Sequence, residues 1–569
     1  MSFVVTQPCC NDAACVQVCP VDCIRPTPDD PQFRSTEMLY IDPKTCIDCG
    51  ACMEACPVEA IHHEDELPED QVRFREINAE YFVRHPLVSS GISYEKPTSA
   101  RIPKQETPLR VAVVGSGPAG IYAAAELMGR MPNGSVEVEM FERLPTPWGL
   151  VRAGVAPDHL ATKAVTDVFR RITGKSGLRF HLNVEIGRHL THDELLEHHH
   201  AVVYAVGALD DRRLDVPGAE LPGSEAATDF VAWYNGHPDH AHRTFDLRSE
   251  RAVIVGNGNV ALDIARMLVT DPDDLVRSDM AEHALEALRD SRIREVVVLG
   301  RRGAAQAAYT TPELLALGRL PGVDVVVDPD ELEAGHVPDA EVPFTTDLKT
   351  RVAREYAAAV PDPAHKRVVL RYLASPTRIL GEDRVEGVEI TRNELVRSDD
   401  GTVTARATEH REVIETGLVL RSIGFRGRSV PGVPFDDRAG VIPNLDGRVV
   451  DPRTGSSLPG VYTTGWVKRG PSGVIGTNKQ CAHDTVTALI DDFLAGRLPD
   501  PSGDNGRDAL DELVRDRRPE VVDRKGWLAI DGAERARGRE TGRPRVKITD
   551  IREMLEIAQV GAPVTTSGA

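Results

Sequence analysis

No stretch of this 569-residue sequence approaches the run of about 18 apolar residues that builds a membrane-spanning helix. The first residues, Met-Ser-Phe-Val-Val-Thr-Gln-Pro, lack the basic and apolar segments of a signal peptide, so we expect a cytoplasmic protein with no membrane span. Positive charge is scarce as well: 67 Lys and Arg face 88 Asp and Glu, and the net charge is −21. That balance argues against nucleic acid as a partner.

Cysteine is nearly absent from most of the chain. Cys481 is the only cysteine beyond residue 56, whereas nine others lie between residues 9 and 56. In a secreted domain such density would indicate disulfides. In a cytoplasmic protein, clustered thiols indicate a metal site instead.

Residues 46–57 carry the spacing C-x₂-C-x₂-C-x₃-C-P, which is typical of bacterial ferredoxins. In such a run three thiolates hold one iron–sulfur cluster, and the fourth points to another cluster. An earlier half-motif ends in Cys19-Pro20 and has cysteine at its first, third and fourth places, with Asp12 at the second. We therefore expect two sets of ligands that exchange their fourth members.

The two expected sets differ in completeness. We call the complete one the second set, and expect it to hold a [4Fe–4S] cluster; its members are Cys19, Cys46, Cys49 and Cys52. The first set has three thiolates, from Cys9, Cys15 and Cys56. It would hold a [3Fe–4S] cluster, or a [4Fe–4S] cluster with Asp12 or Cys10 as a further ligand. A zinc atom is disfavoured, because zinc sites usually supply two separated C-x₂-C pairs.

The segment that carries these motifs is also the most acidic part of the chain. Residues 1–80 contain 16 acidic and 5 basic residues, a net charge of −11. We expect this module to dock on a basic surface elsewhere in the chain. Residues 86–108, rich in Pro, Ser and Thr, indicate a linker after it.

A glycine-rich fingerprint follows the linker. Residues 111–114 predict a strand, Gly115, Gly117 and Gly120 form G-x-G-x-x-G, and a helix pattern begins at once. In this setting the glycines allow a tight turn and the approach of a pyrophosphate to the start of the helix. The next predicted strand ends at Glu142, where an acid would hold ribose hydroxyls. This site is expected to bind FAD.

A second fingerprint, G-x-G-x-x-A, runs from Gly256 through Gly258 to Ala261 after another predicted strand. The strand that follows ends in Arg301 and Arg302 instead of an acid. Guanidinium groups bind a phosphate in a bidentate manner, whereas an acid would repel it. We therefore expect this site to take NADP(H) through its 2′-phosphate.

These patterns predict an α+β ferredoxin module followed by α/β two-dinucleotide-binding domains of glutathione-reductase-like fold. The expected divisions are ferredoxin 1–85, linker 86–108, FAD-binding domain 109–207 and 424–500, NADP-binding domain 208–423, and C-terminal extension 501–569. His198-His199-His200 is expected to be a solvated helix end and not a metal site. Residues 497–525 are polar, and we expect them to be mobile.

Residues 109–558 resemble the adrenodoxin-reductase-type ferredoxin–NADP reductases. The resemblance rests on several motifs: Gly115–Gly120, Pro145–Arg152, Gly154–His159, Gly256–Ala261, Gly300–Gly303, Gly465–Gly470 and Gly473–Asn478. Residues 1–83 resemble a seven-iron bacterial ferredoxin.

The resemblance implies site residues. For FAD it implies Gly115, Gly117, Ala119, Gly120, Glu142, Leu150, Ile186, Trp466, Gly473, Val474 and Ile475. For NADP it implies Arg212, Asn257, Gly258, Asn259, Val260, Arg301, Arg302 and Glu313. The catalytic residues that it implies are His159, Trp466 and Glu313.

The function expected is that of a ferredoxin–NADP reductase. NADPH would reduce FAD, and single electrons would pass to the fused module and on to an external ferredoxin, cytochrome or other one-electron acceptor. One alternative is an electron-relay subunit of a larger flavoenzyme such as a glutamate synthase. A disulfide reductase would need a dithiol near the flavin, and Cys481 alone cannot supply it.

Overall fold

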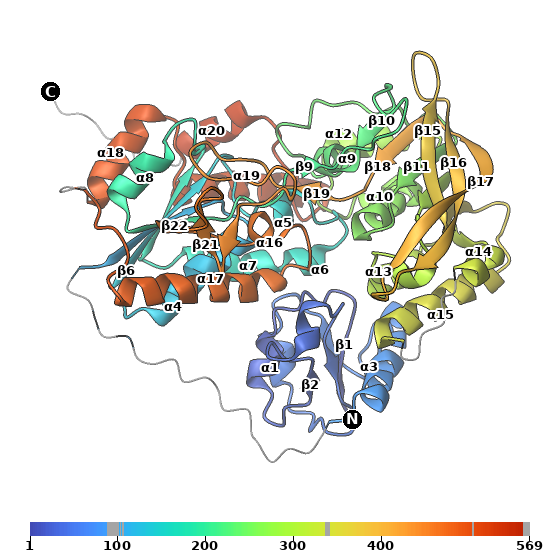
Figure 1. Ribbon diagram of the computed structural model, residues 1–569, viewed down its shortest axis with the longest axis horizontal. Helices are drawn as coiled ribbons and strands as arrows, with labels where there is room; N and C mark the ends of the chain where they lie inside the picture. The colour runs from blue at the N-terminus through green and yellow to red at the C-terminus, as the bar shows by residue number, and fades with distance from the viewer. Residues whose placement is uncertain (88–101, 103, 105–106, 336–341, 503–505, 561–569) are drawn as a thin grey trace.

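The computed structural model describes residues 1–87, 102, 104, 107–335, 342–502 and 506–560, so most of the expected linker lies outside the described residues. Figure 1 shows a small N-terminal module against a larger body of two α/β domains. None of the described helices is both long and apolar enough to cross a membrane.

The N-terminal module consists of two short antiparallel strand pairs and three helices. Its strands are β1 (Phe3–Val5), β2 (Ile24–Arg25), β3 (Tyr40–Ile41) and β4 (Ile61–His63), and its helices are α1 (Ala14–Val18), α2 (Ala51–Ala55) and α3 (Arg73–Arg84). Strand β1 pairs with β4, and β2 with β3. The expected α+β class is confirmed.

The two cysteine motifs of the module have the same backbone course. The residue before α1, Ala13, has a φ of 58°, and Gly50 before α2 has a φ of 75°. Each helix then ends at an extended cysteine that precedes a proline, Cys19 after α1 and Cys56 after α2. The motifs therefore form a structural pseudo-repeat, as their spacing predicts.

The first α/β domain is built on a seven-stranded sheet with the order β20-β21-β22-β8-β5-β6-β7. The strands before residue 207 are β5 (Leu109–Val114), β6 (Val136–Glu142), β7 (Leu178–Leu182) and β8 (Ala201–Tyr204). Those after residue 440 are β20 (Asn444–Leu445), β21 (Arg448–Val450) and β22 (Ser457–Thr463). Strand β22 pairs in parallel with β8, so two distant parts of the chain share one sheet.

Helices cover this sheet and carry its loops. They are α4 (Pro118–Arg130), α5 (Leu150–Ala153), α6 (Leu160–Lys163), α7 (Val165–Thr173), α8 (His192–His198), α16 (Trp466–Arg469) and α17 (Thr477–Leu494). Helices α4 and α17 pack against each other. Both follow glycine-rich turns, which places their N-termini near the site described below.

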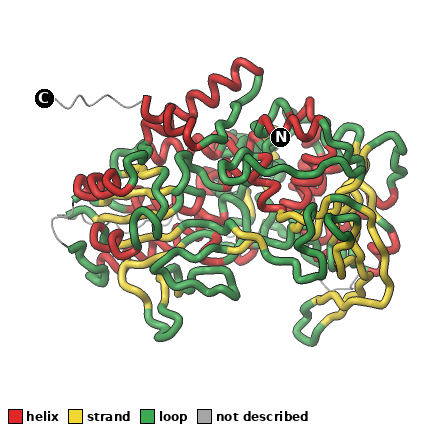
Figure 2. The backbone as a smooth tube through the Cα atoms, turned by 90° about the horizontal axis from the view of Figure 1, so that it is seen from above, coloured by secondary structure: helices red, strands yellow, loops and turns green. Residues whose placement is uncertain are grey.

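The second α/β domain has a six-stranded parallel sheet with the order β10-β18-β11-β12-β14-β13. Its strands are β10 (Ser224–Ala226), β11 (Arg251–Val255), β12 (Glu295–Leu299), β13 (Val323–Val327), β14 (Lys366–Arg371) and β18 (Leu418–Arg421). A three-stranded antiparallel sheet adjoins it, formed by β15 (Ala374–Leu380), β16 (Gly387–Arg397) and β17 (Val403–Glu415). In Figure 2 the strands of the two domains gather in separate groups.

The helices of the second domain are α9 (Ala227–Tyr234), α10 (Asn259–Val269), α11 (Pro272–Leu275), α12 (Glu282–Arg289), α13 (Thr311–Leu317), α14 (Pro329–Ala334) and α15 (Phe344–Ala358). The chain passes between the domains along the antiparallel pair β9 (Asp210–Asp211) and β19 (Phe425–Arg426). The two-dinucleotide fold expected from the sequence is confirmed.

Part of the segment that was expected to be mobile, residues 497–525, forms a packed helix, while residues 503–505 of it lie outside the described residues. Helix α18 (Arg507–Arg517) lies within residues 497–525 and buries Leu510 and Val514 in a core of the first domain. Helices α19 (Arg524–Thr541) and α20 (Ile551–Val560) then pack against each other. For the residues of α18 the expectation was wrong, because the polar residues of this helix lie on one face and the apolar ones on the other.

The histidine run is also more buried than expected. His198 and His199 are both buried, and Nδ1 of His199 lies 2.7 Å from the carbonyl oxygen of Leu195. Burial lowers the pKa of His199 to about 4, so it is neutral at pH 7. The expectation of a solvated helix end was wrong, because these residues lead straight into the buried strand β8.

Candidate functional site

The first glycine cradle lies where β5 ends and α4 begins. Gly115 has a φ of +103°, and a Cβ there would lie 2.5 Å from the carbonyl oxygen of Ala205, so only glycine fits this turn. A Cβ on Gly120 would lie 2.0 Å from the oxygen of Gly115. Gly117 begins α4 without a side-chain cap, which leaves the first amides of the helix open to a phosphate. The cradle fits the pyrophosphate of a dinucleotide.

Glu142 is held beside this cradle at the end of β6. The amide and hydroxyl of Ser116 donate to its Oε2, at 3.2 and 2.8 Å, and the Leu144 amide donates to its Oε1 at 3.1 Å. These hydrogen bonds fix the orientation of the carboxylate next to the helix start. The position suits the ribose hydroxyls of a nucleotide on the cradle.

Two further segments approach the same helix start. A Cβ on Gly465 would lie 2.5 Å from Cβ of Ala119, so the turn that leads into Trp466 rests directly on α4. A Cβ on Gly149 would lie 3.1 Å from Cα of Gly117, which places Leu150 beside the cradle. Ile186 is instead buried in a core cluster with Val114 and Phe141.

The segment Gly473–Ile475 is tied to Trp466. The indole Nε1 of Trp466 donates to the carbonyl oxygen of Ser472 at 3.1 Å, and the Val474 amide donates to the Thr477 hydroxyl at 3.1 Å. Trp466, Gly473, Val474 and Ile475 thus form one surface before α17. The structure brings together most of the residues that the resemblance implies for FAD.

The second cradle lies between β11 and α10. Gly256 has a φ of +111°, and a Cβ there would lie 2.1 Å from the oxygen of Ser422. Gly258 begins α10 without a side-chain cap, and a Cβ there would meet nothing within 4 Å. Asn257 and Asn259 hold the loop before α13, because the Asn257 carbonyl accepts from the Tyr309 amide and Asn259 Oδ1 accepts from the Thr310 amide. Val260 packs on the neighbouring core.

Arg301 and Arg302 follow β12, next to this second cradle. Within the described ranges neither guanidinium has a carboxylate at ion-pair distance, and Nη2 of Arg302 donates to the Gln306 carbonyl oxygen at 3.5 Å. The Arg302 pKa is lowered by burial and by Arg301. Two adjacent cations without an acidic partner fit a phosphate group. Arg212 lies at the crossing between the domains, where its amide donates to the Gly424 oxygen at 3.0 Å.

His159 and Glu313 meet between the two domains. Nε2 of His159 lies 3.7 Å from Oε2 of Glu313, although 154 residues separate them in the chain. Burial raises the pKa of Glu313, an effect that Arg266 opposes, and burial together with Arg266 lowers the pKa of His159. A neutral imidazole beside a carboxyl group of raised pKa is suited to holding or moving a proton. Trp466 lies in a different segment, at the start of α16.

Three charged neighbours of this pair were not predicted from the sequence. Arg266 is 3% exposed and forms a bidentate ion pair with Asp158, with distances of 2.7 and 3.0 Å, while its Nη1 lies 3.4 Å from Glu313. Burial raises the pKa of Asp263, which also binds Arg266, to about 6. Arg266 and Asp263 are the two charged residues of α10, whose other residues are mostly apolar, and charges at those places were the available signal.

The second set of cysteines lines one cavity in the module. Cys19, Cys46, Cys49 and Cys52 share it with Cys23, whose Sγ lies 3.5 Å from that of Cys19. Burial raises the pKa of Cys52 to about 12, so this thiol would stay protonated unless a metal bound it. Four thiols around one cavity fit an iron–sulfur cluster.

The cysteines of the first set are not among the residues that line this cavity. Cys15 is buried, and Cys9 and Cys56 are half-buried. Burial raises the pKa of Cys9 to about 12, and the charges of Cys56 and Asp12 add to this effect. Asp12 is already engaged: Oδ1 accepts the Ala14 amide at 3.0 Å, and Oδ2 lies 3.4 Å from Nζ of Lys479.

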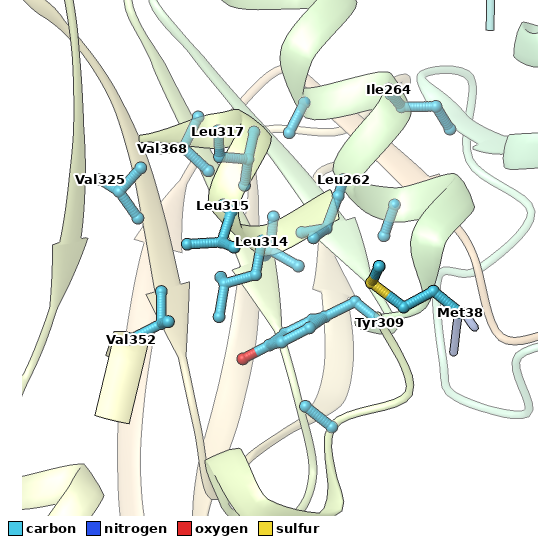
Figure 3. Packing of buried hydrophobic residues seen from close by; sticks show 14 of the residues in the cluster. Met38, Leu262, Ile264, Tyr309, Leu314, Leu315, Leu317, Val325, Val352 and Val368 are labelled. Atoms are coloured by element: carbon cyan, nitrogen blue, oxygen red, sulfur yellow. The ribbon is translucent and has the colours of Figure 1, made fainter. Parts of the chain in front are cut away.

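The module is docked by buried apolar side chains. Met38 is 2% exposed and packs into the second domain beside Tyr309 and Leu262 (Figure 3). The rings of Tyr40 and Phe344 form an edge-to-face contact, with centroids 5.7 Å apart. Such contacts are typical of a stable interface.

Polar contacts extend the docking to the His159–Glu313 pair. Glu37 of the module accepts the Thr311 amide at 2.7 Å and lies 3.1 Å from Nζ of Lys349. The Gln7 side chain hydrogen-bonds to Glu313. The module therefore covers this part of the second domain.

The expectation of a basic docking surface was wrong in part. Among the described residues, three ion pairs join a module acid to a base of the larger body, and three join a module base to an acid. The pairs are Asp12–Lys479, Glu37–Lys349 and Glu80–Arg351, then Arg34–Asp484, Arg73–Glu355 and Arg84–Asp347. The module is acidic overall, but its arginines Arg34, Arg73 and Arg84 lie on the face that docks, so the net charge does not predict the charges at the interface.

Two protein-family models match the chain. The 4Fe-4S binding domain matches residues 39–62, which hold the second cysteine motif, and the pyridine nucleotide-disulphide oxidoreductase model matches residues 109–298. Together with the two glycine cradles, these matches define a flavin-dependent oxidoreductase of the two-dinucleotide class that carries an iron–sulfur module.

Individual proteins are similar over longer stretches. A probable ferredoxin/ferredoxin–NADP reductase of Mycobacterium tuberculosis is 51% identical, covering 98% of this chain and 95% of its own. The NADPH-ferredoxin reductase FprA of Mycobacterium leprae is 47% identical over 79% of this chain and 98% of its own. The structure of Mycobacterium tuberculosis FprA in complex with NADPH is 46% identical over 79% of this chain and all of its own, with a TM-score of 0.75. The chain belongs to the ferredoxin/ferredoxin–NADP reductase family.

Proposed function

We propose that this protein is a ferredoxin–NADP reductase that reduces its own iron–sulfur module with electrons from NADPH and passes them singly to an external acceptor. Hydride loss converts NADPH to NADP⁺ and releases two electrons and a proton. FAD, when bound, accepts the hydride and gives up its electrons one at a time. The observation that carries the proposal is the buried docking of the module across both nucleotide domains. Met38 of the module packs into the second domain, and Asp12 of the module binds Lys479 of the first.

Each site residue has a proposed role. The amides at the start of α4 and Glu142 would hold the pyrophosphate and ribose of FAD, while Trp466 and Gly473–Ile475 would border its ring. The amides at the start of α10 would hold the NADP pyrophosphate, and Arg301 and Arg302 its 2′-phosphate. His159 and Glu313 would hold or move the proton released at the ring.

The second set of cysteines would hold a [4Fe–4S] cluster. For the first set we propose a [3Fe–4S] cluster, because both carboxylate oxygens of Asp12 already have partners in the described structure. A cytoplasmic location is supported by the cysteine motifs, because thiols that bind clusters must stay reduced, and reduced cysteines are typical of that compartment.

Spectroscopy of the anaerobic protein tests this function. Absorption should show bound flavin, and electron paramagnetic resonance should show two distinct clusters. NADPH should bleach the flavin and then reduce the clusters. A protein whose flavin is bleached while both clusters stay oxidised would contradict the proposal.

A truncated protein separates the roles of the two parts. We expect removal of residues 1–90 to leave NADPH-driven ferricyanide reduction intact, since ferricyanide accepts electrons from flavin. Reduction of cytochrome c should fall sharply. A relative of FprA type supports the folding of the larger body alone, because 98% of its own length matches only 79% of this chain. Unchanged cytochrome c reduction would instead favour direct transfer from the flavin.

A further inference from the structure

The first set of cysteines lies at the seam between the module and the larger body. The Gly476 amide donates to the Cys10 carbonyl at 2.7 Å, and Nζ of Lys479 donates to the Asp12 carbonyl at 3.0 Å. Both contacts fall at the start of α17, directly after Gly473–Ile475. The loop between Cys9 and Cys15 thus rests on the chain that borders the proposed flavin position.

The approach at this seam is backbone against backbone. A Cβ on Gly476 would lie 2.2 Å from the carbonyl carbon of Asn11 and 2.3 Å from the Asp12 nitrogen. Gly476 itself has a φ of −68° and a ψ of −25°, which any residue adopts. Its glycine is required by the neighbouring loop and not by its own conformation.

The loop is held rigidly in place for this contact. The Asn11 side chain donates to the Thr36 carbonyl at 2.9 Å, and the Ala14 amide donates to the Asp12 carboxylate at 3.0 Å. Cys10 is buried in the same packed cluster as Tyr122 of α4, with Ile475 against it. A small retreat of this loop would therefore move Cys9 and Cys15, the two cysteines of the first set that flank it.

The second set faces away from the larger body. The residues described around its cavity all belong to the module, between Phe3 and Cys52. Cys49 is exposed, and Ile47 and Met53 beside it are 58% and 44% exposed. This side is open to an external acceptor.

We propose that the Cys10–Gly476 contact is the crossing point for electrons. The cluster held by the first set then receives them from the flavin, and the cluster held by the second set delivers them to the external acceptor. Gly476 is a positioning residue that sets the approach. The inference rests on the proposed function. Each NADPH supplies two electrons, which cross one at a time. Each electron reduces the cluster held by the first set, then the cluster held by the second set, and then one external acceptor.

Substitution at the seam tests the crossing point. In Gly476→Ala the loop must retreat by about 1 Å, because carbon atoms pack at about 3.5 Å. We expect NADPH to bleach the flavin as in the wild type, while reduction of both clusters slows by about ten- to a hundredfold. Amide hydrogen exchange at residues 9–15 should rise. The matched control is Gly129→Ala in α4, where a Cβ meets nothing within 4 Å and no change is expected.

A pair of cysteine variants tests the order. In Cys15→Ala, NADPH should fail to reduce the cluster held by the second set, although dithionite should still reduce it. Electron paramagnetic resonance measures both reactions. In Cys49→Ala, NADPH should still reduce the cluster held by the first set. Reduction of the second set by NADPH at the wild-type rate in Cys15→Ala would overturn the order.

The outcomes separate this inference from the function beneath it. If NADPH reduces neither cluster in the wild type, the proposed function fails. If the wild type works and Gly476→Ala reduces its clusters equally fast, only the inference fails. If Cys15→Ala loses the dithionite signal because the module unfolds, Lys479→Ala and Gly476→Ala decide, and wild-type rates in both would overturn the crossing point.

Discussion

Arg152 and Glu534 form a two-pronged ion pair that fastens the loop beside the flavin cradle to the C-terminal helix α19. Nη1 of Arg152 lies 2.9 Å from Oε2 of Glu534, and the glutamate side chain is fully buried. Burial alone would raise the pKa of Glu534, but Arg152 and Arg545 bring it below its usual value. Through this ion pair the C-terminal extension holds in place the short helix α5, which contains Leu150.

Loss of this pair should destabilise the protein. Breaking a buried ion pair by removing one partner costs about 3–5 kcal/mol, so Glu534→Gln should lower the free energy of unfolding by that amount. We expect flavin to be released earlier in a denaturant titration followed by flavin fluorescence. The control is Glu553→Gln, whose pair with Arg537 on the neighbouring helices is about 40% exposed and should contribute under about 1 kcal/mol. Equal stabilities of the two variants would contradict this bracing role.

Nicotinamide selectivity should depend on Arg301 and Arg302. A hydrogen bond to a charged group contributes about 1.5–3 kcal/mol, so the double variant Arg301→Ala/Arg302→Ala should lose most discrimination against NADH. The measurement is the ratio of kcat/KM for NADPH and NADH. Arg294→Ala, at the opposite end of β12, is the control and should keep the ratio. Wild-type protein that used NADH as well as NADPH would show the assignment to be wrong.

The glycine cradles and the cysteine motifs could be predicted because their chemistry is carried by neighbouring residues. Gly115, Gly117 and Gly120 lie within one strand–turn–helix unit, so their spacing alone predicts the backbone that they form. The pseudo-repeat of Cys19-Pro20 and Cys56-Pro57 is local in the same way.

The docking could not be predicted because it depends on residues far apart in sequence. Nothing near Met38 shows that it will pack beside Tyr309, and nothing near Gly476 shows that Asn11 will lie against it. The net charge of the module predicted a basic partner surface, but Arg34, Arg73 and Arg84 lie on the docked face. His199 was placed in solvent because its neighbours are polar, whereas its position is set by the buried strand β8.

Asp279 should make stability depend on pH. Its oxygens lie 2.6 Å from Nζ of Lys163 and 3.1 Å from Nζ of Lys547, all in the interior. Burial would raise the pKa of Asp279, but the two lysines lower it from 3.8 to about 2. Because the folded pKa is depressed, the stabilisation is complete above pH 3.8 and is lost as the pH falls through about 2.

The variant Asp279→Asn should therefore unfold more easily by about 3–5 kcal/mol at pH 7. Its deficit relative to the wild type should shrink as the pH falls from 4 toward 2. The measurement is chemical denaturation at a series of pH values. Asp246→Asn is the control, since its pair with Arg248 is exposed and should matter little at any pH. A deficit that stayed constant down to pH 2 would show that the charge of Asp279 is not its cause.

The number of iron atoms in the cluster held by the first set should change when Asp12 is replaced by cysteine. Asp12 occupies the place at which the second motif has a cysteine, so Asp12→Cys supplies the missing thiolate. We expect the isolated wild type to show the electron paramagnetic resonance signal of an oxidised three-iron cluster, and the variant to lose it. Iron content should rise by one atom per chain. A wild-type protein with two four-iron clusters would contradict the prediction and point to Cys10 as a ligand.

Electron transfer within the chain should be nearly independent of salt. Of the six ion pairs that the described residues form across the docking interface, three carry the acid on the module and three carry the base. Four of them are exposed enough for salt to screen them, whereas Met38, Tyr40 and Phe344 are buried and uncharged. Reduction of the clusters by NADPH should thus vary by less than about twofold between low and high ionic strength. Reduction of cytochrome c by the same protein should fall with salt, because that encounter is bimolecular and the acidic module would attract a basic partner. If cluster reduction fell as steeply as cytochrome c reduction, charge and not apolar packing would hold the module in place.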